Sequence, residues 1–394
     1  MKFPWLMSTL ENDGPLLSVH LDTTRTDPRT AAEVTTRWTR LRAELSRAGA
    51  PDDLLDTVEE AIREPSAMGG PHGRAIIASA EEILVDRTLP VPPITECAQW
   101  ARAPKLLPFI QLTPFAVSQL LVEVDRAGAD LTLCAPENPS LTRGSTDLGE
   151  HGSVDGGHDE LHKAGLGGGS KHGWRSNNFE ARVEDSWERN AEAVAATVTK
   201  LVSEHRPDMV LLTGDVRAQS LLKDELGQEV LSRLHIVPGG TRGVSLERAS
   251  FREELDRITR EFIEGRQREL GERFHESQAR DAESVAGAFE VVEALDRGQV
   301  DELVLVTGRE PDNVEDLIRR AIRTDAGISA LGDDYADIPE GVGALLRWKD
   351  AATPSNSAAS MSGDPGREVE MNPLREELFE DGTDYEKKLN ALQV

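Results

Sequence analysis

DMVLLTGDVRAQSLLKDELGQEVLSRLHIVPGG, residues 208–240, is the stretch that decides the fold class of this chain. Residues 209–214 form a short, uncharged apolar run, which is typical of a strand buried on both faces of a parallel sheet. Residues 215–234 are predicted to form a helix, and residues 235–240 form a second short strand that ends in a Pro-Gly-Gly turn. This alternation of strand and helix predicts an α/β domain.

The same alternation on both sides of this stretch predicts three successive α/β domains and a disordered acidic tail. We place the first domain at residues 1–115, the middle domain at 116–258, the third domain at 259–348 and the tail at 349–394. A chain of 394 residues exceeds one ordinary domain, which agrees with this division. The tail has ten acidic and five basic residues and few apolar ones, so it lacks the side chains needed for a core.

Each domain is assigned from strand-like runs and from helical periodicity. The first domain has predicted strands at 15–23, 74–79 and 82–87 and predicted helices at 28–49 and 52–63. The middle domain has a hairpin at 119–135 joined at DRAGAD, with Gly128 available for the turn, an irregular segment at 136–173 and a helix at 177–205. A long charged helix that starts near 246 and ends near 277 links it to the third domain. The third domain has a helix, a glycine turn and a strand within 285–306, a helix at 313–327 and the closing stretch 340–348. The helix at 177–205 is expected to bury a stripe made of Phe179, Val183, Trp187, Ala191, Val194 and Val198.

The composition limits the partners. With 71 acidic and 44 basic residues the net charge is -27, which repels DNA and anionic membranes, so an anionic partner has to be met through a local patch. The first 14 residues lack the apolar region of a signal peptide, and prolines interrupt the longest apolar stretch, 106–122. The two cysteines, Cys97 and Cys134, offer no disulfide framework. We therefore expect a soluble, cytoplasmic protein that does not bind membranes.

One segment differs from this acidic background. No carboxylate occurs between Leu161 and Phe179, in the stretch HKAGLGGGSKHGWRSNN, whereas Lys163, Lys171 and Arg175 add three positive charges. Its glycines allow the backbone to pass through narrow spaces. The stretch is therefore a candidate contact patch for an anionic partner.

Motifs for enzymatic chemistry are weak. HDELH at residues 158–162 spaces two histidines as i and i+4, yet the zincin pattern requires Glu where Asp159 stands, and the flanks are glycine-rich. GLGGGSK at 165–171 offers glycine amides to an anion but does not meet the Walker A spacing. No nucleophile elbow is present. We assign no catalytic residue and no cofactor, while a metal site involving His158 and His162 stays open as an alternative.

Three segments resemble the superfamily of peptide-chain release factor subunit 1 and Pelota. AGAFEVVEALDRGQVDELVLV, residues 286–306, is similar to a stretch of that family's third domain, and EGVGALLRW, residues 340–348, is similar to its closing strand. GWRSNNFEARVEDSW, residues 173–187, lies where the family has its glycine-glycine-glutamine loop and the helix after it. The matching positions in the first segment are Gly287, Val291, Ala294, Leu295, Gly298, Val300, Asp301 and Leu303.

The sequence departs from that family at the residues that perform termination. Counted back from Phe179, Trp174 stands where the family has its catalytic glutamine, and no glutamine occurs between Leu120 and Ala218. That glutamine positions the water that attacks the ester of peptidyl-tRNA, so release activity is not expected. The Asn-Ile-Lys-Ser motif for stop-codon reading is also missing, since Asn12 is the only asparagine in the first 115 residues.

The degenerate loop makes the chain most similar to the bacterial branch that contains the ribosome hibernation factor Balon and its actinobacterial relatives. The resemblance implies a non-enzymatic, tRNA-shaped factor that binds the vacant ribosomal A site and can arrive with elongation factor Tu. The first domain would then face the decoding site, and the third domain would face a translational GTPase or ribosomal proteins. The loop residues expected to meet ribosomal RNA are Gly167, Gly168, Gly169, Lys171, His172, Gly173, Trp174 and Arg175.

Three other readings of the residues stay open. The stretch around Trp174 is also compatible with a linker in which the indole packs on the first turn of the following helix. The histidines are compatible with a metal-dependent hydrolase that acts on RNA or peptidyl-tRNA. The acidic tail is compatible with a stress-induced interaction protein that recruits a partner.

Overall fold

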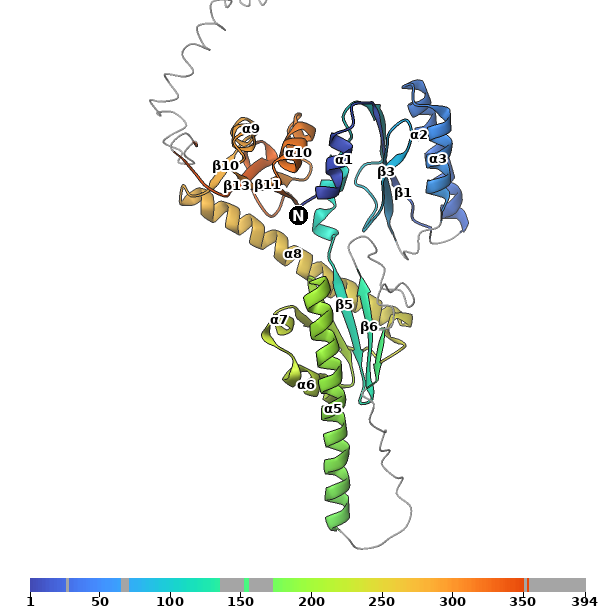
Figure 1. Cartoon of the computed structure of the whole chain (residues 1–394), viewed down its shortest axis with the longest axis vertical. Coiled ribbons are helices and arrows are strands. Elements are labelled where there is room, and N and C mark those ends of the chain that lie inside the picture. Colours follow the sequence, from blue (N-terminus) through green and yellow to red (C-terminus); the bar gives the residue numbers. More distant parts are fainter. Residues whose placement is uncertain (26–27, 65–70, 135–151, 156–172, 351–352, 354–394) are drawn as a thin grey trace, which may run out of the picture.

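The computed structural model describes residues 1–25, 28–64, 71–134, 152–155, 173–350 and 353. These residues form three β-sheets, each covered by helices, in agreement with the predicted α/β class. Figure 1 shows the first and third units side by side and the middle unit below them. No helix in the described part of the chain has the length and apolarity needed to span a bilayer.

The first sheet is antiparallel, with the strand order β3-β2-β1-β4. Helices α2 and α3 cover one face through a core that includes Trp38, Leu41 and Leu55. The other face of this sheet packs into a second core, which also contains side chains of the third unit. The elements are η1 (Pro4–Leu6), α1 (Met7–Leu10), β1 (Leu16–Asp22), α2 (Pro28–Arg47), α3 (Asp52–Arg63), β2 (Gly73–Ala78), β3 (Ile83–Leu89), β4 (Cys97–Ala101), α4 (Leu107–Gln111) and η2 (Thr113–Phe115).

The middle sheet is mixed, with the order β7-β6-β5-β8-β9. Strands β5, β8 and β9 run parallel, whereas β6 and β7 are antiparallel to their neighbours. Helices α5, α6 and α7 cover one face, and the first half of α8 covers the other. The elements are β5 (Gln119–Val124), β6 (Gly128–Cys134), β7 (Ser153–Asp155), α5 (Gly173–His205), β8 (Met209–Gly214), α6 (Val216–Glu225), α7 (Gln228–Leu231), β9 (Leu234–Ile236), η4 (Ser245–Glu247) and α8 (Ala249–Ala279).

The third sheet has the order β10-β13-β11-β12, in which only β11 and β12 are parallel. Helices α9 and α10 pack on the face that looks toward the first unit, and the second half of α8 packs on the opposite face through Phe274. The elements are β10 (Ser284–Ala286), α9 (Ala288–Asp296), β11 (Val300–Val306), α10 (Val314–Arg323), β12 (Gly327–Leu331), η5 (Pro339–Gly341) and β13 (Val342–Leu346).

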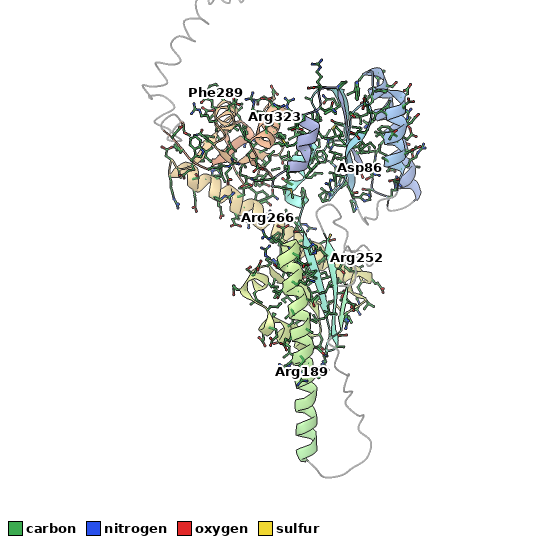
Figure 2. The ribbon with its side chains drawn as sticks, in the orientation of Figure 1. Asp86, Arg189, Arg252, Arg266, Phe289 and Arg323 are labelled. Atoms are coloured by element: carbon green, nitrogen blue, oxygen red, sulfur yellow. The ribbon has the colours of Figure 1, made fainter. Side chains whose placement is uncertain are left out.

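Helix α8 is common to the middle and third units. Its 31 residues give a length of about 46 Å, and the boundary expected at residue 258 falls inside it. Phe251 and Leu255 pack under the middle sheet, while Phe274 packs under the third. Between them Arg266 forms an ion pair with Asp208, 3.1 Å away, at the start of β8 (Figure 2). A single rigid element thus connects the two sheets.

Three local features differ from the sequence expectation or go beyond it. The hairpin turn falls within the expected stretch DRAGAD, but Gly128 is the first residue of β6 and has no positive φ: the Asp125 carboxylate holds the turn by accepting hydrogen bonds from the amides of Ala127 (2.8 Å) and Gly128 (2.9 Å). The helix predicted over 215–234 is divided into α6 and α7, because Leu226 takes extended backbone angles and is buried. The short strands β4, β7, β10 and β12 were not predicted, since three to five residues carry little periodic signal.

The first and third units share one hydrophobic core. Leu106, Phe109 and Ile110, which lie in or next to α4, pack with side chains of α10. Polar contacts surround this core: the Glu315 carboxylate accepts hydrogen bonds from the amides of Leu106 (2.9 Å) and Leu107 (3.3 Å) at the start of α4. Burial raises the pKa of Glu315, and these two amides oppose that shift. The two units are therefore joined as one packed body.

His20 on β1 is buried beside this junction. Its Nε2 donates a hydrogen bond to the Lys105 carbonyl (3.0 Å), its ring packs edge-on against Phe109, and its Nδ1 has no partner among the described residues. Burial lowers the pKa of His20 to about 4. The histidine is therefore neutral in the folded protein at physiological pH.

We expect His20 to make the protein sensitive to acid. A lowered folded-state pKa means that protons favour the unfolded chain, so stability is present above pH 6.5 and is lost as the pH falls toward 4. From pH 7.5 to pH 4.5 this histidine alone should remove about 2.5 kcal/mol from the free energy of unfolding. Urea titrations at both pH values should show a smaller loss in His20→Gln. An equal loss in both proteins would refute the assignment.

Candidate functional site

The candidate site lies where the parallel strands β5 and β8 end, which is the edge at which open α/β sheets bind ligands. Asp125 and Arg126 follow β5, and Asp215 follows β8. The Asp215 carboxylate caps α6 by accepting hydrogen bonds from the amides of Arg217 (2.9 Å) and Ala218 (3.0 Å). Charged side chains are therefore held at fixed places on this edge.

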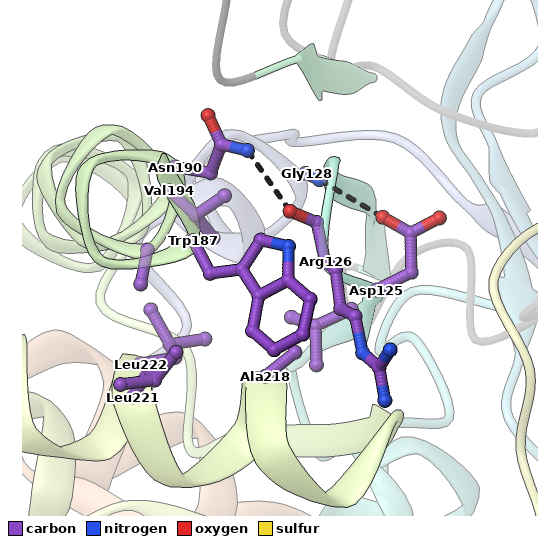
Figure 3. Close-up of a pocket in the computed structure, with 11 residues that line it drawn as sticks. Asp125, Arg126, Gly128, Trp187, Asn190, Val194, Ala218, Leu221 and Leu222 are labelled. Atoms are coloured by element: carbon purple, nitrogen blue, oxygen red, sulfur yellow. Dashed lines mark hydrogen bonds between the residues drawn. The ribbon is translucent and has the colours of Figure 1, made fainter. Parts of the chain in front are cut away.

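Arg126 connects this edge to helix α5. Its guanidinium lies 4.4 Å from the centre of the Trp187 ring and forms an ion pair with Asp215 at 3.4 Å. Its carbonyl accepts a hydrogen bond of 2.9 Å from the side-chain amide of Asn190, which is buried (Figure 3). The pocket between these residues has a free volume of about 10 Å³, which admits at most one water molecule. It is a packed junction and not a ligand cavity.

Asp125 connects the same turn to the opposite side of the sheet. Its Oδ1 accepts a hydrogen bond of 3.1 Å from Arg242, which lies in the connection between β9 and α8. Arg242 also donates to Asp130 on β6 (3.0 Å) and to Ser153 on β7 (3.0 Å). Arg242 therefore connects the 125–128 turn to strands β6 and β7, just as Arg126 connects this turn to α5.

The loop residues predicted to meet RNA are only partly described. Gly167, Gly168, Gly169, Lys171 and His172 lie outside the described residues. Gly173, Trp174 and Arg175 were expected in a loop, but α5 begins at Gly173 and not near Asn177, so they occupy its first turn. Because a helix rises 1.5 Å per residue, this turn stands about 21 Å from the Trp187 junction. Figure 1 shows this half of α5 extending beyond the middle sheet.

The predicted buried stripe of α5 is present where the side chains are described. Ala191, Val194 and Val198 are buried against the sheet, and Trp187 is partly exposed under Arg126. The side chains of Phe179 and Val183 lie outside the described part. The second half of α5 is therefore the half that fixes the helix on the sheet.

The described residues add no catalytic group to the site. His151, His158, His162 and His172 lie outside them, and within them no three potential metal ligands come together. Cys134 ends β6, and burial raises the pKa of its thiol to about 12, so it is not a thiolate at neutral pH. Burial also raises the pKa of Cys97.

Sequence reasoning missed Asp125, Arg126 and Arg242. The first two could have been found from their place directly after a strand of a parallel pair. Arg242 carried no such signal, because its three acceptors are 89 to 117 residues away along the chain.

Comparisons with known proteins give one family match and two sequence relatives. Residues 118–280, which include the middle sheet and all of α8, match the family described as bacterial archaeo-eukaryotic release factor family 2. The uncharacterized protein Rv2629 of Mycobacterium tuberculosis is 29% identical over 377 residues, which covers 87% of this chain and 95% of that protein.

The solved structures that match this chain do so at low sequence identity and low TM-score. Dom34 of Saccharomyces cerevisiae, a translation termination-like factor, is 11% identical, with a TM-score of 0.38 over 72% of this chain and 81% of that chain. Pelota of Archaeoglobus fulgidus is 13% identical, with a TM-score of 0.31 over 71% of this chain and 80% of that chain.

Gly214 is required at the end of β8, and we predict that Gly214→Ala destabilises the protein. Its φ is +121°, and an added Cβ would lie 1.9 Å from the Val124 carbonyl oxygen, which accepts the Asp215 amide. The expected loss is about 2–4 kcal/mol by urea unfolding. Gly265→Ala is the matched control, because it lies inside α8 with open space at its Cβ and should gain about 0.5–1 kcal/mol. Equal stability of the two variants would contradict the assignment.

Proposed function

We propose that this chain, whose residues 118–280 match bacterial archaeo-eukaryotic release factor family 2, is a ribosome-binding factor that occupies the vacant A site and inhibits translation without hydrolysing peptidyl-tRNA. In this proposal it is a hibernation factor. The observation that carries the proposal is the family match over residues 118–280, combined with the absence of glutamine between Leu120 and Ala218. In this proposal the middle unit reaches the peptidyl-transferase centre without supplying a glutamine for hydrolysis.

The middle unit is suited to probing a deep RNA-lined site. Helix α5 has 33 residues and a length of about 50 Å, and its second half is fixed on the sheet by Trp187 and Asn190. Residues 162–178, which include its first turn, have no carboxylate and contain Lys171 and Arg175. Phosphate contacts by these side chains supply position and affinity, and Trp174 supplies a surface on which a base stacks.

The remaining surface is suited to selectivity. The net charge of -27 disfavours non-specific RNA binding, so binding requires the local basic segment together with contacts to proteins. We propose three functional domains close to the limits 1–115, 116–258 and 259–348, with α8 shared by the last two and the first domain facing the decoding site. Elongation factor Tu is the proposed GTPase partner, and the third unit offers it an exposed side chain, Phe289 (Figure 2).

The test is sedimentation of the purified full chain with vacant 70S ribosomes. The wild type should co-sediment, and the triple variant Lys171→Glu, Trp174→Ala, Arg175→Glu should bind at least about tenfold more weakly, because it loses one stacking contact and reverses two charges. Binding of the wild type should also weaken as salt is raised.

The matched control reverses two exposed charges elsewhere. Arg252 on α8 and Arg323 on α10 are exposed, and Figure 2 shows both away from the first turn of α5. Arg252→Glu with Arg323→Glu gives the same change in net charge and should bind nearly as well as the wild type. If the wild type does not sediment with ribosomes, the proposed function is wrong. If both variants bind equally weakly, overall charge and not the segment determines binding.

A further inference from the structure

A shallow hollow lies at the carboxyl ends of β5 and β8, beside the start of α6. It has a free volume of about 520 Å³ and is lined by Arg126, Asp215, Val216, Arg217 and Ser220. Because one side of the hollow is open to solvent, it does not enclose a small molecule as ligand pockets do. Its shape suits a chain that lies across it.

Val216 is an unusual side chain for this place. It is 81% exposed, more than any other large hydrophobic side chain in the described part of the chain. The packing of α6 does not require it, because Ala218, Leu221 and Leu222 are the side chains that α6 buries. A single exposed valine is common on protein surfaces, but this one shares its hollow with two arginines.

Arg126 is held in place before any partner binds. Its guanidinium lies 4.4 Å from the centre of the Trp187 ring, and its Nη2 lies 3.4 Å from Asp215 Oδ2, next to the start of α6 (Figure 3). The side chain is 52% exposed, so the guanidinium can still donate to a partner in solvent. A fixed guanidinium fork binds a phosphate through two parallel hydrogen bonds and loses little conformational freedom in doing so.

The side chains of the hollow carry more positive than negative charge, although the chain as a whole is acidic. Arg126 and Arg217 face a single carboxylate, that of Asp215. Both of its oxygens are in use, because Oδ1 accepts the amides of Arg217 and Ala218 and Oδ2 pairs with Arg126. Since these amides are taken by the helix cap, an anionic partner meets the two guanidinium groups and not the end of α6.

The hollow is at the end of the middle unit that lies away from the other two units. Strand β5 begins close to η2, where the Thr113 hydroxyl accepts the amide of Ala330 in the third unit. Its six residues carry the chain about 20 Å from that contact before it reaches Arg126. Figure 1 shows β5 extending away from the first and third units. A partner that receives the middle unit end-on therefore meets this hollow.

We propose that this hollow is an RNA-binding surface that takes the sugar-phosphate backbone of a single strand. Arg126 and Arg217 bind phosphates, and Val216 packs against a ribose. The choice of RNA over an acidic protein rests on the proposed function, in which the middle unit enters an RNA-lined site. Arg217 and Val216 are the residues to change, because both are exposed, whereas Arg126 also holds α5.

Binding of the purified full chain to a fluorescein-labelled oligouridine tests the surface without the ribosome. Arg217→Ala should lower the slope of log K against log salt by about one, because it removes one phosphate contact, and Arg217→Glu should weaken binding at least about tenfold. Val216→Ser should weaken binding about threefold and leave the slope unchanged, because it removes apolar contact and no charge.

Lys223→Glu is the matched control for Arg217→Glu. Lys223 is exposed in the last turn of the same helix and does not line the hollow, so this variant makes the same change in net charge and should bind nearly as well as the wild type. Equal weakening by Lys223→Glu and Arg217→Glu would show that overall charge determines binding, and the proposal would be wrong.

Sedimentation of the same variants with vacant 70S ribosomes separates this surface from the proposed function. Arg217→Glu should bind ribosomes more weakly than Lys223→Glu. A wild type that binds the oligonucleotide through Arg217 but does not sediment would refute the proposed function and support the RNA surface. Wild-type binding by Arg217→Glu in both assays would overturn the surface and leave the proposed function intact.

Two further outcomes also decide the matter. Loss of ribosome binding in Arg217→Glu without weaker oligonucleotide binding would show that the hollow meets a protein, which overturns RNA as its occupant. A wild type that binds neither the oligonucleotide nor ribosomes would overturn both the surface and the proposed function.

Discussion

The architecture depends on one shared helix. Both the middle and the third sheet need an apolar cover on the face that their other helices leave open, and α8 covers both faces. Phe251, Leu255 and Ile258 pack against the middle sheet, and Phe274 packs against the third sheet. Gly271 allows the helix to approach the third unit closely, since a Cβ there would lie 2.2 Å from the Tyr335 carbonyl oxygen. Removing α8 from either sheet would expose a core.

The shared core between the first and third units has the complementary effect. This core joins the first and third units into one body. At the edge of the core, the Glu315 carboxylate accepts hydrogen bonds from two backbone amides of the first unit. The middle unit is connected to this body through α8 and through the short link between η2 and β5. The extended half of α5 thus points away from the paired first and third units.

The middle unit is held together by contacts between residues that are distant in sequence. Cation-π stacking of Arg126 on Trp187 spans the middle unit from β5 to α5, and the three bonds of Arg242 reach back from the β9–α8 connection to the 125–128 turn, β6 and β7. Each of these contacts is modest, but together they fix a turn from both sides. The ion pairs are partly exposed, so most of the stability of the unit still comes from the buried faces of α5 and α8.

The sequence by itself determined the elements with strong local patterns. The apolar run of β8, the amphipathic stripe of α5 beyond Trp187 and the helix-turn-strand at residues 288–306 follow from periodicity, which is a property of neighbouring residues. The family resemblance and the loss of the catalytic glutamine were also readable from residue order. The roles of Trp174, Lys171 and their neighbours stay predictions.

Only the tertiary structure decided how these elements meet. The periodicity of α8 does not tell which sheet each half covers, and the three-residue β7 has too few positions for a pattern. The turn at Asp125 shows the same limit. The sequence pointed to Gly128, whereas the turn is held by the Asp125 carboxylate, which accepts hydrogen bonds from the amides of Ala127 and Gly128. Such choices depend on atoms brought together from distant parts of the chain, because the free energy of a buried face or a charged hydrogen bond is set by its partner and not by its neighbours in sequence.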